Sequence, residues 1–284
     1  MTPPLTPWRA IWGHLRALAS EQDCYLCGGG ASAPVCTGCV AAFPPLPAAR
    51  CLCCALPSAA GQRCGRCRSH PPHYDTTVAA LAYGDPLDHA VQALKYHHAL
   101  GLSRFLSGLL DDAVGAAGAV GATGAVGATG AAGATGAAGA PMTDTGIDLI
   151  IPLPLAPARL SERGFNQALE LARPIAARRR IALGVRAVRR IRNTPPQVQL
   201  PWKERARNIQ GAFVCDVSLK GLRVAVVDDV MTTGASLDEM ARVLKGAGAA
   251  HVANWVVART LPQAWRAPSV PSVPSVPSVP PAPD

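Results

Sequence analysis

The sequence predicts an α/β fold, in which helices cover a mostly parallel sheet, together with a small cysteine-rich segment near the N-terminus. Short aliphatic runs bounded by turn residues occupy residues 147–151, 224–227 and 251–258, a pattern typical of buried parallel strands. Apolar residues at helical spacing follow the first two runs, so that strands and helices alternate. The N-terminal segment is set apart because nine of the ten cysteines lie between residues 24 and 67.

Length and charge limit the classes of protein that the chain can belong to. Its 284 residues are enough for one large domain or two smaller ones, even without its low-complexity segments. The net charge of +9 is consistent with anionic partners such as phosphates or nucleic acid, although such a balance more often reflects a solvated surface. Residues 1–20 lack the continuous apolar stretch of a secretory signal, and residues 113–142 lack Leu, Ile and Phe. We therefore expect a cytoplasmic protein without membrane insertion.

The cysteines form four C-x-x-C pairs, a spacing that places two thiolates on one metal ion. The spacers between the first two pairs and between the last two are short, which favours two successive structural zinc ribbons, although cross-pairing is also compatible with the sequence. Disulfides or redox-active pairs are the alternative, and the reducing cytosol disfavours them. Cys53 offers an extra thiol beside the third pair, and Cys54 preserves the spacing. The expected zinc ligands are Cys24, Cys27, Cys36, Cys39, Cys51, Cys54, Cys64 and Cys67.

Residues 76–83 are expected to form a strand, and apolar spacing predicts helices that begin at Leu87 and over residues 102–110. The first helix leads into Lys95, which either reaches a phosphate or lies at a solvated helix end. Tyr96, His97 and His98 come next. Adjacent residues on a helix do not face one another, so the two histidines are not expected to share a metal ion.

Two low-complexity segments interrupt this pattern. Glycine recurs at every third position from residue 115 to residue 139 without the proline that a collagen helix requires, which indicates a flexible tether. The C-terminal Pro-Ser-Val repeats predict a disordered tail. The expected organisation is a tail or helix at 1–20, a double zinc ribbon at 21–72, a main domain at 73–114 and 141–262, an insert at 115–140 and a disordered tail at 263–284.

Two segments between the predicted strands carry many basic residues. The strand at residues 147–151 ends at two prolines, and Arg163 follows in a loop before a packed helix over residues 165–176, so this loop is free to bind a ligand. Residues 189–213 are basic and polar without a clear period until Phe213. They are either a mobile loop that closes over a phosphate ligand or a solvated basic face. Cys215 is expected to be a small core residue in a strand.

The stretch after the strand at residues 224–227 indicates a sugar-phosphate site. Asp228 and Asp229 lie at the carboxyl end of the strand, where carboxylates can accept hydrogen bonds from ribose hydroxyls. A loop and a helix start follow, and Ser236 with Glu239 fits a capping box that would begin the helix near Ser236. Backbone N–H groups and hydroxyls there are suited to a phosphate. The loop residues are Thr232, Thr233, Gly234 and Ser236.

This stretch resembles the binding motif for 5-phosphoribosyl 1-pyrophosphate (PRPP) of type I phosphoribosyltransferases. With the cysteine pairs and the motifs at residues 95–97, 150–154, 163–167, 193–197 and 204–208, the chain resembles the competence-associated ComF/GntX family over residues 20–110 and 146–260. The family implies a type I phosphoribosyltransferase-like α/β fold with an N-terminal zinc-ribbon segment. It also implies a role in natural competence, in DNA uptake or in the use of imported DNA.

The resemblance implies Mg²⁺ with PRPP as ligand and structural Zn²⁺. Asp228 and Asp229 would hold the ribose, while Thr232, Thr233, Gly234 and Ser236 would hold the 5-phosphate. Arg163, counted with the two acids as catalytic, or the loop at residues 192–207 would stabilise the leaving pyrophosphate. The acceptor substrate is unidentified. The alternative is a non-catalytic protein that retains this fold and binds single-stranded nucleic acid or the competence machinery.

Overall fold

The computed structural model describes residues 22–59, 62–96, 99–123, 146–192, 209–263 and 265. The predicted N-terminal tail, most of the predicted insert and nearly all of the predicted C-terminal tail lie outside these residues. So do the two adjacent histidines and the greater part of the basic segment, residues 193–208.

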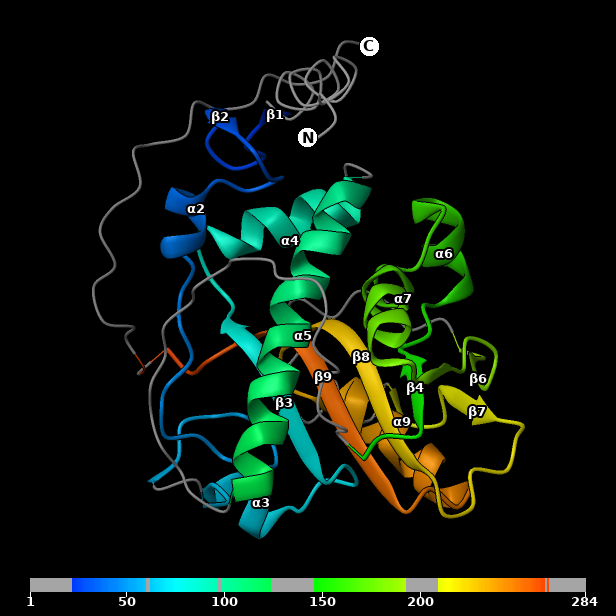
Figure 1. The fold of residues 1–284 in the computed structure, drawn as a ribbon. Coiled ribbons are helices and arrows are strands. Elements are labelled where there is room, and N and C mark those ends of the chain that lie inside the picture. The colour runs from blue at the N-terminus through cyan, green and yellow to red at the C-terminus, as the bar shows by residue number, and fades with distance from the viewer. Residues whose placement is uncertain are drawn as a thin grey trace, which may run out of the picture.

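A five-stranded parallel sheet forms the centre of the molecule and confirms the predicted α/β class (Figure 1). Each strand is parallel to its neighbours, and the order across the sheet is β3-β9-β8-β4-β5. The strands are β3 (Thr76–Ala82), β4 (Leu149–Pro152), β5 (Ala182–Leu183), β8 (Arg223–Met231) and β9 (His251–Arg259). The middle strand, β8, therefore pairs with a neighbouring strand along each of its edges.

Helices cover both faces of this sheet. The crossover from β4 to β5 contains α7 (Gln167–Arg179), which packs with α5 (Leu100–Thr123) on one face, and α4 (Leu87–Tyr96) contacts α5. The crossover from β8 to β9 contains α9 (Ala235–Gly246) on the other face (Figure 1). The strand order therefore reverses between β4 and β8. Ligands of open α/β sheets bind beyond the carboxyl ends of the strands at such a point.

The residues of β8 explain why a continuous apolar run forms the central strand. Val224 and Val226 pack with α9, whereas Ala225 and Val227 pack with α5 and α7, and all four are fully buried. A strand with both faces covered needs apolar side chains at every position. After Val227 the strand continues with two acids, Asp228 and Asp229, toward its carboxyl end.

Helix α5 is longer than predicted. The sequence indicated residues 102–110, but the helix continues to Thr123 and into the Gly/Ala repeat. Alanine has the highest helix propensity, and the apolar row of Leu102, Leu106, Leu110 and Val114 buries the first part of the helix against the sheet and α7. The expected flexible tether is therefore wrong for residues 115–123. Among the described residues, none of the helices is both long and apolar enough to cross a membrane.

The short elements that were not predicted include the helix after β4 and the first strand of a small antiparallel ribbon. Helix α6 (Pro157–Arg163) follows β4, and β6 (Val188–Arg190) pairs with β7 (Phe213–Cys215) as a separate antiparallel ribbon. The predicted strand position of Cys215 corresponds to β7, where its side chain is half-buried rather than in the core. Its thiol donates a hydrogen bond to the carbonyl of Val217.

The cysteine-rich residues form two separate units. The first contains β1 (Gln22–Asp23), β2 (Gly30–Ala31) and α2 (Thr37–Ala41), and it packs on the face of the sheet that carries α5. The second contains α3 (Gly65–Ser69) and joins the core on the face that carries α9. Figure 1 shows α2 and α3 near opposite ends of α5.

Candidate functional site

The loop after β8 has the shape of an anion-binding turn. Helix α9 begins at Ala235, and Gly234 precedes it with a φ of 82°. A Cβ atom at Gly234 would lie 2.6 Å from Cε of Met231, so a side chain there would have to displace its neighbour. Within the part of the chain that the structure describes, the backbone N–H groups of Thr232, Thr233 and Gly234 have no hydrogen-bond acceptor. These donors are free for a ligand at the start of a helix.

The predicted capping box at this helix start is wrong. No side chain caps α9, and the hydroxyl of Thr233 accepts a hydrogen bond from the N–H of Ala235 at 3.3 Å. Glu239 instead accepts from the N–H of Gly211 and pairs with Arg242. The N–H of Gly211 and the guanidinium of Arg242, one turn further along α9, replace the predicted capping bond. Ser236 is half-buried in the first turn of α9, next to the loop.

Two carboxylates lie just before this loop and face a lysine from a distant helix. Asp229 is buried, Asp228 is half-buried, and each accepts a hydrogen bond from the next backbone N–H in β8. Nζ of Lys95, in the last turn of α4, lies 2.7 Å from Oδ2 of Asp229. This ion pair differs from both predicted roles of Lys95, which were a phosphate ligand and a solvated helix end. No local sequence pattern indicates this ion pair, because α4 and β8 are far apart in the chain.

The two carboxylates differ in pKa, because Lys95 forms its ion pair with Asp229. Burial raises the pKa of Asp228 well above its ordinary value, and the adjacent charge of Asp229 raises it further. Burial also acts to raise the pKa of Asp229, but the charge and hydrogen bonding of Lys95 lower it below its ordinary value. Although burial favours neutral Lys95, Asp229 keeps the pKa of that ammonium raised. One acid is therefore held as a carboxylate and its neighbour binds protons readily.

Arg163 reaches the site from the end of α6, not from the loop in which it was predicted. Its guanidinium lies 5.0 Å from the ring centre of Tyr96 and donates hydrogen bonds to Tyr96 Oη and Gln167 Oε1. Its Nε is buried without a hydrogen-bond partner among the described residues. Asn166, from the same motif, caps α7 and donates to the carbonyl of Leu153. Asn166 and Gln167 therefore make contacts within the protein, whereas Nε of Arg163 is still free to donate to a ligand.

Two further arginines add positive charge beside the acids. Burial lowers the pKa of Arg190 and the charge of Arg159 lowers it further, while Asp228 opposes both effects. The guanidinium of Arg190 also stacks over Phe213 at 5.7 Å. The carboxyl edge of β8 thus combines two acids with cations from α4, α6 and β6.

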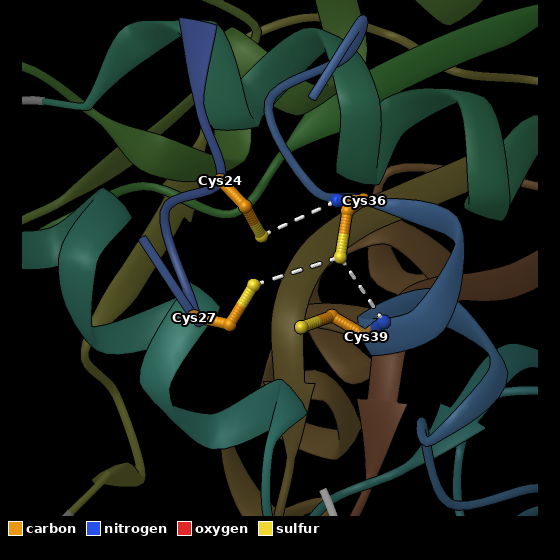
Figure 2. Close-up of side chains that lie close together, drawn as sticks. All are labelled: Cys24, Cys27, Cys36 and Cys39. Carbon is orange, nitrogen blue, oxygen red and sulfur yellow. Dashed lines mark hydrogen bonds between the residues drawn. The ribbon is translucent and has the colours of Figure 1, made fainter. Parts of the chain in front are cut away.

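The eight paired cysteines come together in the two groups expected from their spacing, without cross-pairing. Within each group, all four sulfur atoms lie within 4.8 Å of one another. Figure 2 shows the first group, in which the sulfur atoms from two knuckles point toward a common centre. Four convergent thiols at this separation fit a tetrahedral metal ion. The groups are Cys24, Cys27, Cys36 and Cys39, and Cys51, Cys54, Cys64 and Cys67.

Backbone hydrogen bonds prepare one thiol of each group as a thiolate. Burial raises the pKa of Cys24, but backbone N–H groups, including those of Cys36 and Leu26, lower it to about 6. The same balance lowers the pKa of Cys51 to about 7. Cys53 lies outside the second group and donates its thiol to the carbonyl of Tyr74. The ambiguity of the third pair is thereby resolved in favour of Cys54.

A buried arginine lies between the second cysteine group and the loop after β8. Arg259, the last residue of β9, is 1% exposed, and the sequence pattern of a buried strand did not reveal it. Its guanidinium donates hydrogen bonds to the carbonyls of Cys54, Met231, Thr232 and Thr260. Arg66, on α3, donates to the carbonyl of Thr233 at 3.0 Å.

Known relatives share most of this chain. No family model matches it. It is 32% identical over 212 residues to the DNA utilization protein YhgH of Salmonella typhimurium, which covers 73% of this chain and 83% of the relative. It is 30% identical over 201 residues to competence protein F of Haemophilus influenzae, covering 70% and 79%. An adenine phosphoribosyltransferase of Mycobacteroides abscessus is 41% identical over 83 residues, which are 28% of this chain and 45% of that protein.

Identity of this extent, over two thirds or more of the relatives' own length, establishes the family. It agrees with the resemblance that the cysteine pairs and the acid-rich strand end indicate in the sequence. The chain belongs to the ComF family, the family of competence protein F and the DNA utilization protein YhgH.

Proposed function

We propose that this chain binds Mg²⁺ and PRPP at the carboxyl edge of β8 and is a phosphoribosyltransferase-like protein of natural competence or DNA use. One observation carries the proposal. The unpaired backbone N–H groups before α9 directly follow β8, the strand whose carboxyl end carries Asp228 and Asp229. N–H donors suit a 5-phosphate, and adjacent carboxylates suit ribose hydroxyls.

Each part of the site has a role in this proposal. Thr232, Thr233, Gly234 and Ser236 hold the 5-phosphate, and Asp228 and Asp229 accept hydrogen bonds from the ribose. Mg²⁺, when bound, would neutralise charge on the pyrophosphate. Arg163, with a buried donor still free, and Arg190 would face the same group and stabilise the charge that develops on it as it leaves. The acceptor is not part of the proposal.

The names of the relatives support a biological role for the proposed chemistry. Members of the family carry the names DNA utilization protein and competence protein, and a phosphoribosyltransferase is similar over a shorter stretch. We therefore propose a role in the handling of imported DNA. Contact with single-stranded DNA or with the competence machinery remains a prediction, since the greater part of the basic segment that would supply it lies outside the described residues.

Titration calorimetry with Mg²⁺ and PRPP tests the ligand. The parent chain should bind, and Asp228→Asn with Asp229→Asn should weaken binding by at least about 100-fold, because two charged acceptors of the ribose are lost. Asp216→Asn removes one negative charge from an exposed ion pair with Arg189 and should bind as the parent does. Absence of binding by the parent would sink the proposal. Normal binding by the double variant would mean that the acids do not hold the ribose.

Metal analysis tests the cysteine groups. We propose that each holds one structural Zn²⁺, so purified protein should contain about two equivalents per chain, because a four-thiolate site binds one ion. Cys215→Ser changes a cysteine outside both groups and should retain both ions. Protein that contains no zinc and has eight thiols reactive toward alkylating reagents would refute the assignment.

A further inference from the structure

Arg259 has no acidic partner despite its burial. Within the described residues, no carboxylate lies within ion-pair distance of its guanidinium, which donates to four backbone carbonyls. A buried cation without a counter-charge is costly. The charged group that could balance it is the cysteine group beside it, since the carbonyl of Cys54 accepts from Arg259 Nε at 2.8 Å. Four thiolates around one divalent ion carry a net charge of about −2.

The same arginine sets the direction of the loop peptides. Arg259 holds the carbonyls of Met231 and Thr232, and Arg66 holds that of Thr233. In a planar trans peptide, the N–H points opposite to the C=O of the preceding residue. Three consecutive carbonyls that are held toward the arginines therefore turn the N–H groups of Thr232, Thr233 and Gly234 to the other side. These are the N–H groups that lack an acceptor in the described structure.

Both arginines depend on the second cysteine group for their positions. Arg66 lies in α3, between the cysteine ligands Cys64 and Cys67, and Arg259 bonds to the knuckle at Cys54. The first group packs against α4 and α5 on the opposite face of the sheet. Among the described residues, none of its members bonds to the loop after β8.

We propose that the second cysteine group, when it holds its metal ion, fixes the phosphate-binding conformation of residues 231–234 through Arg259 and Arg66, whereas the first group does not. The metal supplies charge and rigidity, and the two arginines are positioning residues that contact the loop and not the ligand. This inference rests on the proposed function for its effect on PRPP. Its effect on the loop itself is independent of any ligand. Loss of this metal would therefore weaken phosphate binding at a site that contains no cysteine.

Amide hydrogen exchange of the peptide that covers residues 228–238 tests the inference without a ligand. Cys64→Ser and Cys36→Ser form a matched pair, because each removes a half-buried ligand from one of the two groups. Each should lose about one zinc. Only Cys64→Ser should accelerate exchange of the hydrogen-bonded amides beside the loop, by about 10-fold or more. These are the amides of Ala235 and Asp238, whose acceptors, Thr233 Oγ1 and the carbonyl of Gly234, lie in the loop that loses its fixed donors. Equal acceleration in both variants, or none in either, would overturn the inference.

Titration with Mg²⁺ and PRPP supplies the second readout. Cys64→Ser should bind about 10-fold or more weakly than the parent. Arg66→Gln keeps all cysteines and changes an exposed side chain, so it should fold, retain both zinc ions and still bind about 3- to 10-fold more weakly. Arg259→Lys should retain zinc and show a larger loss, because one ammonium cannot replace the guanidinium fork. Parent-like affinity in Arg66→Gln would overturn the role of that arginine.

The two proposals fail in different ways. A parent chain that does not bind PRPP refutes the proposed function, while the exchange comparison between Cys64→Ser and Cys36→Ser still decides the coupling. If Arg259→Lys does not fold, the parent treated with a zinc chelator replaces it. The inference would be contradicted if chelation accelerated exchange of the loop in the parent, while Cys64→Ser showed no such acceleration either before or after chelation. Acceleration that matches Cys64→Ser supports it.

Discussion

Replacing Asp111 by asparagine is expected to lower the free energy of unfolding by about 3–5 kcal/mol, because the change leaves a buried arginine without its carboxylate. Asp111 lies in α5 and is 1% exposed, and it accepts hydrogen bonds from Arg178 and Arg179 of α7. The side chain of Arg179 is 2% exposed and also donates to the carbonyl of Asp111 at 2.6 Å. The pair joins the two helices that cover one face of the sheet.

Urea unfolding followed by circular dichroism measures this effect. The matched control is Asp216→Asn, which makes the same chemical change in an exposed pair with Arg189, where the two side chains are 54% and 62% exposed. Exposed pairs contribute about 0–1 kcal/mol, so the control should unfold nearly as the parent does. If the Asp111 variant were no less stable than the control, the buried pair would not hold α5 to α7.

The elements predicted best are those whose signal lies within one short stretch. The apolar run of β8, the acids at its end and the helix start after the loop are contiguous in the sequence, so their relative placement follows from strand and helix geometry alone. The cysteine groups were predictable for the same reason, since their spacing is local. The parallel sheet followed from the alternation of strands and helices.

The features of the site that were not predicted depend on contacts between distant segments. The sequence fits a capping box at Ser236 and Glu239, but the N–H of Gly211, 28 residues away, donates to the Glu239 carboxylate in the folded chain. Arg259 ends an apolar strand, and its partners are backbone carbonyls, which no residue pattern reveals. The predicted end of helix α5, at residue 110, is too early. The period of the Gly/Ala repeat indicates a tether, although its alanines favour a helix, which continues to Thr123.

Lys95→Met is expected to destabilise the protein by about 3–5 kcal/mol at about pH 8, because it leaves the buried carboxylate of Asp229 without its ion-pair partner and beside a second carboxylate. With Lys95 present, the pKa of Asp229 is lowered, so this acid stabilises the fold above its unfolded pKa of about 4, and that stability is lost as the pH falls through the folded pKa. Without Lys95, burial and Asp228 should raise the pKa of Asp229, and its ionisation should then oppose folding as the pH rises.

The difference in stability between the parent and Lys95→Met should therefore be small at about pH 5 and large at about pH 8, measured by urea unfolding at each pH. Lys245→Met is the matched control, because Lys245 is also 2.7 Å from a carboxylate, that of Asp75, but at a more exposed position. It should show a loss of about 1 kcal/mol or less. Lys95→Arg retains the charge and should keep most of the stability at about pH 8.

The same variant separates a structural role of Lys95 from a role in binding. If Lys95 only neutralises Asp229, then Lys95→Met should bind Mg²⁺ and PRPP more weakly at about pH 8, by about 10-fold, and Lys95→Arg should bind nearly as the parent does. Weak binding by Lys95→Arg, with its stability intact, would instead assign the ammonium a contact with the ligand. Parent-like stability and affinity in Lys95→Met would mean that the pair with Asp229 supports neither the fold nor the site.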